Sequence, residues 1–160
     1  MKRLFLLMCL GLLLAGLGSV SHASGTDALP TLKVDTLAGK SFDLAAQRGK
    51  WVIVNYWATW CHPCIHEMPA ISTFVQDHDD VTAIGLAYQD ADPVDLRAFL
   101  KKHPVSYPIA KVDPAHPPAA FGAPLGLPTT YLIAPDGHIA KRFVGPITPA
   151  DLKKVIDAAK

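Results

Sequence analysis

The chain contains few cysteines, and their small number limits the kinds of disulfide that it can form. Only three cysteines occur in 160 residues, at positions 9, 61 and 64. Two residues separate Cys61 from Cys64, which is too short a spacing to link distant parts of a fold but is typical of a reversible disulfide. We therefore expect a redox-active pair and no framework of structural disulfides.

The chain also lacks an excess of charge of either sign. It contains 15 Lys and Arg against 14 Asp and Glu. If Lys2 and Arg3 leave with an N-terminal leader, 13 basic residues remain against 14 acidic ones, a net charge of −1. This balance gives no reason to expect nucleic acid or an anionic membrane surface as a partner.

The longest hydrophobic run lies at the N-terminus. It extends from Leu4 to Val20, follows Lys2-Arg3 and ends in Ser21-His22-Ala23, as in a secretory signal cleaved after Ala23. The alternative is an uncleaved anchor, because the run is close to the roughly 18 residues of a spanning helix. We expect residues 1–23 to be this signal or anchor, 24–30 a tether and 31–160 one domain, placed in the periplasm. Cys9 falls inside the leader and is interpreted as a residue of the apolar run with no functional role.

Hydrophobic patterning and turn residues predict strands alternating with helices. The expected order is a hairpin at 32–44, a strand at 51–56, a helix after 61, a strand at 81–87, a helix at 93–102, a short strand within 107–112, strands at 128–133 and 138–144, and a last helix from 149. Residues 113–127 hold at most one short helix, near 119–121. Asp92 is expected to cap the helix at 93–102, and Thr148, with Asp151 three residues beyond it, the last helix. This order predicts an α/β protein with helices on both sides of a mixed sheet.

Cys61 lies where a strand gives way to a helix. Consecutive β-branched residues from Val52 to Val54 indicate a strand covered on both faces. Free N–H groups and the macrodipole at the start of the helix favour a thiolate, which makes Cys61 the candidate nucleophile. Pro69 is expected to kink the helix without ending it. The apolar stripe predicted for this helix consists of Ile65, Met68, Ile71 (or Ser72) and Val75.

Three motifs in combination resemble the thioredoxin superfamily. They are Trp60-Cys61-His62-Pro63-Cys64 between strand and helix, Pro69 in that helix, and Leu127-Pro128-Thr129 before a late strand. With Asn55 upstream and Glu67-Met68-Pro69 downstream, the region is more narrowly similar to the TlpA/ResA/DsbE-like thiol:disulfide oxidoreductases. The resemblance covers 32–160. It implies a thioredoxin-like fold, with a central mixed β-sheet flanked by helices, an N-terminal β-hairpin and a central αβ insert from 93 to about 112.

The resemblance also implies a substrate groove. It places a cis peptide bond before Pro128, with this proline against the disulfide and the Leu127 backbone free to pair with a substrate strand. Thr129 belongs to the same segment, the insert shapes the groove, and Trp60 borders the exposed sulfur. The alternative for Pro128 is an ordinary loop proline, one of fourteen in the chain.

Two polar residues depart from cytoplasmic thioredoxin. Asn55 stands six residues before Cys61, where thioredoxin has a buried aspartate, and an amide cannot take a proton from the second thiol. Glu67, the only glutamate in the chain, lies one helical turn after Cys64, at the position where this subfamily carries its acidic residue. We interpret Glu67 as the base that assists Cys64. The alternative is a solvated carboxylate on the helix surface.

His62 and Pro63 are expected to tune the redox potential in opposite directions. A protonated His62 beside Cys61 would stabilise the thiolate and make the disulfide more oxidising. Pro63 has no N–H to donate to the sulfur, which works the other way.

These residues predict a thiol:disulfide oxidoreductase that needs no cofactor beyond the Cys61-Cys64 couple and no metal. Its expected substrates are thiols and disulfides of exported proteins, including those of cytochrome c maturation, and its expected electron source is a membrane thiol donor. We expect a monomer. A different hypothesis is a copper or zinc metallochaperone that uses both cysteines with His66 or His62. Covalent haem attachment is excluded because Ile65 follows Cys64 where histidine is required.

Overall fold

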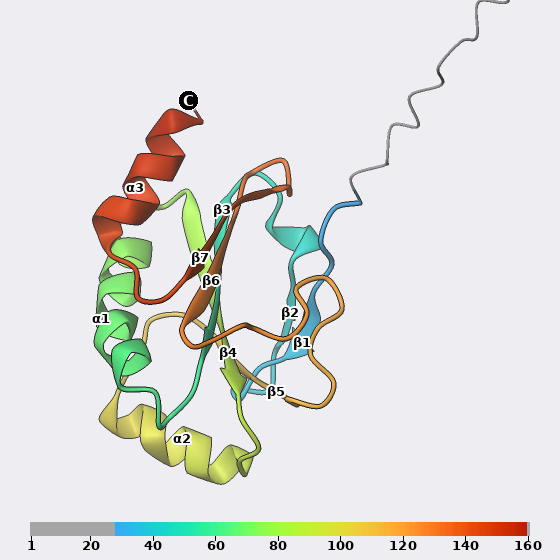
Figure 1. Ribbon diagram of the computed structural model, residues 1–160, viewed down its shortest axis with the longest axis vertical. Coiled ribbons are helices and arrows are strands. Elements are labelled where there is room, and N and C mark those ends of the chain that lie inside the picture. The colour runs from blue at the N-terminus through green and yellow to red at the C-terminus, as the bar shows by residue number, and fades with distance from the viewer. Residues whose placement is uncertain (1–27, 160) are drawn as a thin grey trace, which may run out of the picture.

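A five-stranded mixed sheet forms the centre of the computed structural model, which describes residues 28–159. Its strand order is β5-β4-β3-β6-β7, and a separate two-stranded hairpin, β1-β2, lies beside it (Figure 1). The strands are β1 Lys33–Asp35, β2 Ser41–Asp43, β3 Trp51–Trp57, β4 Val81–Tyr88, β5 Ile109–Val112, β6 Thr129–Ile133 and β7 Ile139–Val144. The helices are α1 His62–Asp77, α2 Pro93–Lys102 and α3 Pro149–Ala158, with a short 3-10 helix at Ala45–Gln47.

Strand β3 occupies the middle of the sheet, where its mostly apolar side chains are shielded from water. All seven of its residues are buried, and it pairs in parallel with β4 and antiparallel with β6. Its side chains alternate, so that Ile53 and Trp57 enter one hydrophobic cluster while Val54 and Tyr56 enter the other. The prediction of a strand covered on both faces is confirmed, and β3 carries the chain to Cys61 from the centre of the sheet.

The two faces of the sheet are covered by different kinds of structure. All three helices contribute to one cluster, through Met68 of α1, Leu96 of α2 and Leu152 of α3. The opposite face is covered by the hairpin region, with Phe42 and Leu44, and by Phe121 from the β5–β6 connection. Helices therefore flank the sheet as predicted, but the expectation of helices on both sides is corrected: the hairpin covers the second face, and α2 lies near one end of the sheet (Figure 1).

Helix α1 begins directly after Cys61, which is its N-cap, and continues through Pro69 to Asp77, as predicted. Its buried side is rotated from the predicted stripe, since Ile65 and Val75 are only half-buried. The predicted stripe left out Cys64 and Glu67, and both are buried here together with Ser72, which the prediction gave as the alternative to Ile71. The buried residues of α1 are Cys64, Glu67, Met68, Ile71, Ser72 and Phe74.

The capping residues read from the sequence occupy their expected places. The Asp92 carboxylate accepts a hydrogen bond of 2.6 Å from the Val94 N–H at the start of α2. At the start of α3, Thr148 and Asp151 form a capping box in which each side chain bonds the other residue's backbone N–H. Such caps satisfy backbone donors that would otherwise lack partners.

Three tyrosines fasten the β5–β6 connection to the sheet. The hydroxyl of Tyr88 on β4 donates to the Pro114 carbonyl at 3.1 Å, and that of Tyr131 on β6 donates to the Phe121 carbonyl at 3.0 Å. Tyr56 on β3 makes a longer bond of 3.4 Å to the Gly122 carbonyl. Turns replace the short helix that the sequence allowed near 119–121.

The leader assignments, including Cys9 and the choice between a cleaved signal and an anchor, lie outside the described residues, as does most of the tether at 24–30. Within residues 28–159, none of the helices combines the length and the apolar character that crossing a membrane requires.

Candidate functional site

A disulfide joins Cys61 and Cys64 where β3 passes into α1. The S–S distance is 2.03 Å and the two Cα atoms are 5.3 Å apart. Cys61 is the N-cap residue and Cys64 lies in the first turn, so both sulfurs are near the free N–H groups of the helix. Cys61 is 5% exposed and Cys64 is fully buried. A helix N-terminus lowers the pKa of a thiol, so the reduced pair has a chemical reason to be reactive.

Glu67 lies one turn further along α1 and is buried, with 4% of its surface exposed. One carboxylate oxygen accepts a hydrogen bond of 2.8 Å from the Asn55 side-chain amide, and the other accepts one of 2.9 Å from the Ile147 backbone N–H. The alternative of a solvated surface carboxylate is therefore wrong. Positions three apart share one side of a helix, which places Glu67 on the same side as Cys64.

Burial raises the pKa of Glu67 to about 7, because the charged form loses its hydration, while the hydrogen bonds from Ile147 and Asn55 oppose the rise. Burial likewise raises the pKa of Tyr107, with a smaller contribution from the negative charge of Glu67. A carboxyl that titrates near neutral pH can both accept and release a proton under ordinary conditions.

Asn55 connects this carboxylate to the sheet. Its amide nitrogen donates to Glu67 and also, at 2.9 Å, to the Thr130 hydroxyl on β6. Its amide oxygen is buried and has no hydrogen-bond partner. Sequence reasoning noted Asn55 only for the aspartate it replaces and missed Thr130 and Ile147. No local signal marks them, because they are 75 and 80 residues from the groups they bond.

The Leu127-Pro128 peptide bond is cis, as the resemblance implies. Pro128 is buried immediately before β6, and Leu127 is half-buried against the cluster that contains both cysteines. Thr129 is fully buried and its hydroxyl donates to the Gly126 carbonyl at 2.7 Å. The segment is thus held in place, and the catalytic part assigned to Pro128 stays a prediction.

The residues around the disulfide differ in their exposure. His62 and Pro63, between the two cysteines, are exposed. Trp60 is 68% exposed although it is a large aromatic residue, whereas Trp57, three residues earlier, is fully buried. An exposed tryptophan next to a reactive cysteine is a frequent contact for a partner protein.

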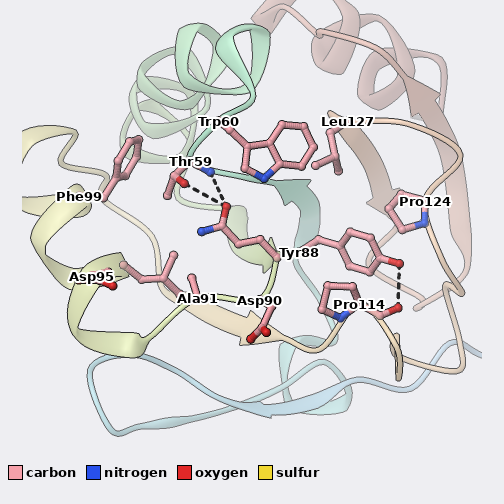
Figure 2. Close-up of a pocket in the computed structure, with 12 residues that line it drawn as sticks. Thr59, Trp60, Tyr88, Asp90, Ala91, Asp95, Phe99, Pro114, Pro124 and Leu127 are labelled. Carbon is pink, nitrogen blue, oxygen red and sulfur yellow. Dashed lines mark hydrogen bonds between the residues drawn. The ribbon is translucent and has the colours of Figure 1, made fainter.

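Trp60 lies at the edge of an open cavity of about 790 Å³. We call this cavity the Trp60 groove; its wall includes Trp60, Tyr88, Asp95, Phe99, Pro124 and Leu127. Figure 2 shows Trp60 and Leu127 along one side, with Phe99 and Asp95 contributed by α2. Sequence reasoning placed a groove here through the insert, and α2 does supply part of its wall.

A second, smaller hollow of about 390 Å³ gives Glu67 access to the surface. Its wall includes Glu67, the neighbouring Pro63 and His66, and Ile147 and Thr148 at the start of α3. Glu67 therefore borders a hollow whose lining residues are separate from those of the Trp60 groove.

The described residues contain no group of three or more His, Cys, Asp and Glu side chains placed to hold a metal ion. The metallochaperone hypothesis would use His62 or His66 as a third ligand, and both lie exposed on α1. The geometry of the described residues therefore provides no observation that favours the metallochaperone hypothesis.

Comparison with known proteins identifies the relatives. Residues 23–157 match the Redoxin family. The thioredoxin-like protein YneN of Bacillus subtilis is 30% identical over 131 residues, covering 80% of this chain and 76% of that protein. The thiol-disulfide oxidoreductase ResA of Geobacillus thermodenitrificans is 30% identical over 160 residues, covering 93% of this chain and 91% of that protein.

Comparison with solved structures identifies relatives of the same kind. A thiol:disulfide interchange protein of the thioredoxin family from Chlorobium tepidum has a TM-score of 0.71 and 29% identity, over 82% of this chain and 94% of that one. A DsbF homologue from Corynebacterium diphtheriae has a TM-score of 0.72 and 28% identity, over 81% and 85%. The chain belongs to the Redoxin family and is a thiol:disulfide oxidoreductase of the ResA/DsbE-like branch of the thioredoxin superfamily.

Proposed function

We propose that this protein reduces disulfides of exported proteins outside the cytoplasmic membrane, with Cys61 as the attacking sulfur and Cys64 as the resolving one. One observation carries the assignment: the helix begins at Cys61, the more exposed cysteine, while Cys64 is fully buried on the same side of α1 as the carboxyl of Glu67. An incoming disulfide meets the outer sulfur first.

The reaction begins from the dithiol. The Cys61 thiolate attacks one sulfur of the target disulfide, forming a mixed disulfide and releasing the other target sulfur as a thiolate that takes up a proton. The Cys64 thiolate then attacks Cys61, the mixed disulfide breaks, and the second target thiol leaves. Two electrons have passed from the pair to the target, and the Cys61-Cys64 disulfide remains.

Glu67 serves the second step as proton acceptor. Cys64 is fully buried, so its thiol cannot pass its proton directly to bulk water. A carboxyl with a pKa of about 7 is ionised often enough at neutral pH to accept this proton. The hollow beside Pro63 and Thr148 then lets the proton reach solvent.

The remaining parts of the proposal concern partners. A membrane thiol donor returns two electrons to the disulfide after each cycle, and cysteines prepared for cytochrome c maturation are among the targets, as the TlpA/ResA/DsbE-like resemblance suggests. A monomer is sufficient for the reaction, since each copy contains both sulfurs. His62 and Pro63, exposed between the cysteines, set the potential.

The deciding experiment combines insulin reduction with a redox titration. The reduced protein is expected to reduce insulin in the presence of a strong chelator, and the Cys61-Cys64 couple to titrate near the thioredoxin value of about −270 mV. A potential near −120 mV would instead make the protein an oxidant. Stoichiometric copper or zinc binding without thiol exchange would favour the metallochaperone.

A further inference from the structure

We propose that the Trp60 groove selects extended target segments that carry an apolar and a cationic side chain close to the reactive cysteine. The inference rests on the proposed function, because the groove delivers such a segment to Cys61. Three properties of the wall support it: aromatic surface, an unbalanced negative charge and a free hydrogen-bond donor.

The aromatic surface comes from separate elements that meet at the groove. Trp60 precedes Cys61 and Phe99 belongs to α2, while Leu127, before the cis proline, adds aliphatic surface beside them. Because Trp60 is 68% exposed, a partner that covers it removes a large apolar area from water. Since Trp60 is the residue next to Cys61, the groove is suited to an apolar side chain near the sulfur under attack.

The charge on the wall is of one sign. Among the described residues, Asp90 and Asp95 are the acidic side chains that line the groove, and no lysine or arginine of that part of the chain lines it. Lys111 lies 3.6 Å from the Asp90 carboxylate and offsets part of its charge. Asp95, exposed in the first turn of α2, has no ion-pair partner among residues 28–159, so the wall keeps a net negative charge. Two carboxylates beside aromatic rings favour a lysine or arginine and repel an acidic segment.

Gln89 adds the donor. It is 9% exposed, and its amide oxygen accepts hydrogen bonds from the Thr59 backbone N–H at 2.8 Å and the Thr59 hydroxyl at 3.1 Å. These bonds fix the amide, and within the described residues its nitrogen has no protein partner. An N–H donor in the groove wall matches the backbone carbonyl of an extended segment. A cationic, extended peptide thus satisfies all three properties at once.

The test uses peptides in which one cysteine forms a mixed disulfide with glutathione. The peptides are identical except at the two positions that lie two residues before and two residues after that cysteine. Both positions carry Lys in one peptide, Gln in the second and Glu in the third. The reduced full chain is expected to reduce the Lys peptide with a kcat/KM about tenfold above that of the Glu peptide, as two exposed ion pairs allow. The ratio should shrink at 1 M salt, where the Debye length is about 3 Å.

The double variant Asp90→Asn/Asp95→Asn is expected to lower the Lys-to-Glu ratio to about two or less, because the attractive charges are gone. Asp79→Asn, which removes an exposed carboxylate after α1, is the matched control and should keep the wild-type ratio. Equal rates for Lys and Glu peptides in the wild type, or an unchanged ratio in the double variant, would overturn the inference. If the protein reduces none of the peptides and does not reduce insulin, the proposed function is overturned as well as this inference.

Discussion

The two sulfurs are three residues apart, yet their surroundings differ. Around Cys64 the structure is closed: the nearby carboxyl of Glu67 is buried and bonded to Asn55 and to the Ile147 N–H. Beside Cys61 it is open, with an exposed Trp60 and a groove of about 790 Å³. The proposed mechanism assigns proton transfer to the closed side and recognition to the open side. Changes on one side should therefore leave the other largely intact.

The largest effect is expected from Cys64→Ala. Without the resolving sulfur, the mixed disulfide at Cys61 cannot be released, and turnover should fall about a hundredfold or more. Mass spectrometry after exposure to insulin should show the target linked through Cys61. Cys61→Ala is the reciprocal variant and should trap nothing. Trapping by Cys61→Ala, with none by Cys64→Ala, would reverse the roles.

Glu67→Gln comes next and tests the closed side. In the wild type, the rate of resolution should rise with pH through about 7, where the carboxyl ionises. The variant should lose this inflection and resolve about tenfold to a hundredfold more slowly above it. Stopped-flow measurement of mixed-disulfide decay gives both values. Asp77→Asn, at the exposed end of α1, controls for loss of a carboxylate, and an unchanged profile for Glu67→Gln would remove it from the mechanism.

The same variant has a stability signature. The folded pKa of Glu67 is raised from 4.5 to about 7, so the folded protein binds more protons than the unfolded chain between these values. Wild-type stability should therefore decrease as pH rises through this window, by up to ~3 kcal/mol. Denaturant unfolding of the oxidised proteins at pH 5 and pH 8 should show this decrease in the wild type and lose it in Glu67→Gln.

Asn55→Asp should have an intermediate effect. It replaces the amide that donates to Glu67 at 2.8 Å with a second carboxylate. Two like charges at this distance disfavour ionisation, so the midpoint of the pH–rate profile should rise by about one unit or more. Thr130→Val, which removes only the other bond of the Asn55 amide, should shift it less. A midpoint that moves to lower pH would contradict the role assigned to the amide.

The smallest effect is expected on the open side, from Trp60→Ala. Loss of this exposed surface should lower kcat/KM for insulin about threefold to tenfold, as for a peripheral interface residue. The pH–rate profile of resolution should keep its midpoint, because Glu67 is not touched. Ile139→Ala, which shortens another exposed apolar side chain at the far end of β7, is the control and should leave insulin reduction unchanged.

Sequence reasoning recovered the features that depend on neighbours in the chain. The strand before Cys61, the helix through Pro69, and the caps at Asp92 and Thr148 follow from local patterns. The cis bond before Pro128 came from the family resemblance instead. Local patterns are enough for these elements because their causes are backbone geometry and short-range hydrogen bonds.

Long-range contacts were beyond those patterns. The stripe predicted for α1 omitted Cys64 and Glu67. Glu67 is buried because two groups distant in the chain, the Asn55 amide and the Ile147 N–H, donate to its carboxylate. The hairpin's position over the second face depends on tertiary packing, as does the fully occupied carboxylate of Glu67. Neither feature produces a periodic pattern of residues that could be recognised in a single sequence.

The tyrosine hydroxyls that hold residues 113–127 to the sheet have a consequence for how such proteins diversify. Tyr88 and Tyr131 bond to carbonyl oxygens, which every residue type provides, so the identity of the loop residues is free to vary while the loop stays anchored. Pro114 and Pro124 of this loop line the groove. New client preferences can therefore arise by replacing loop side chains, without altering the electron-transfer pair or its proton acceptor.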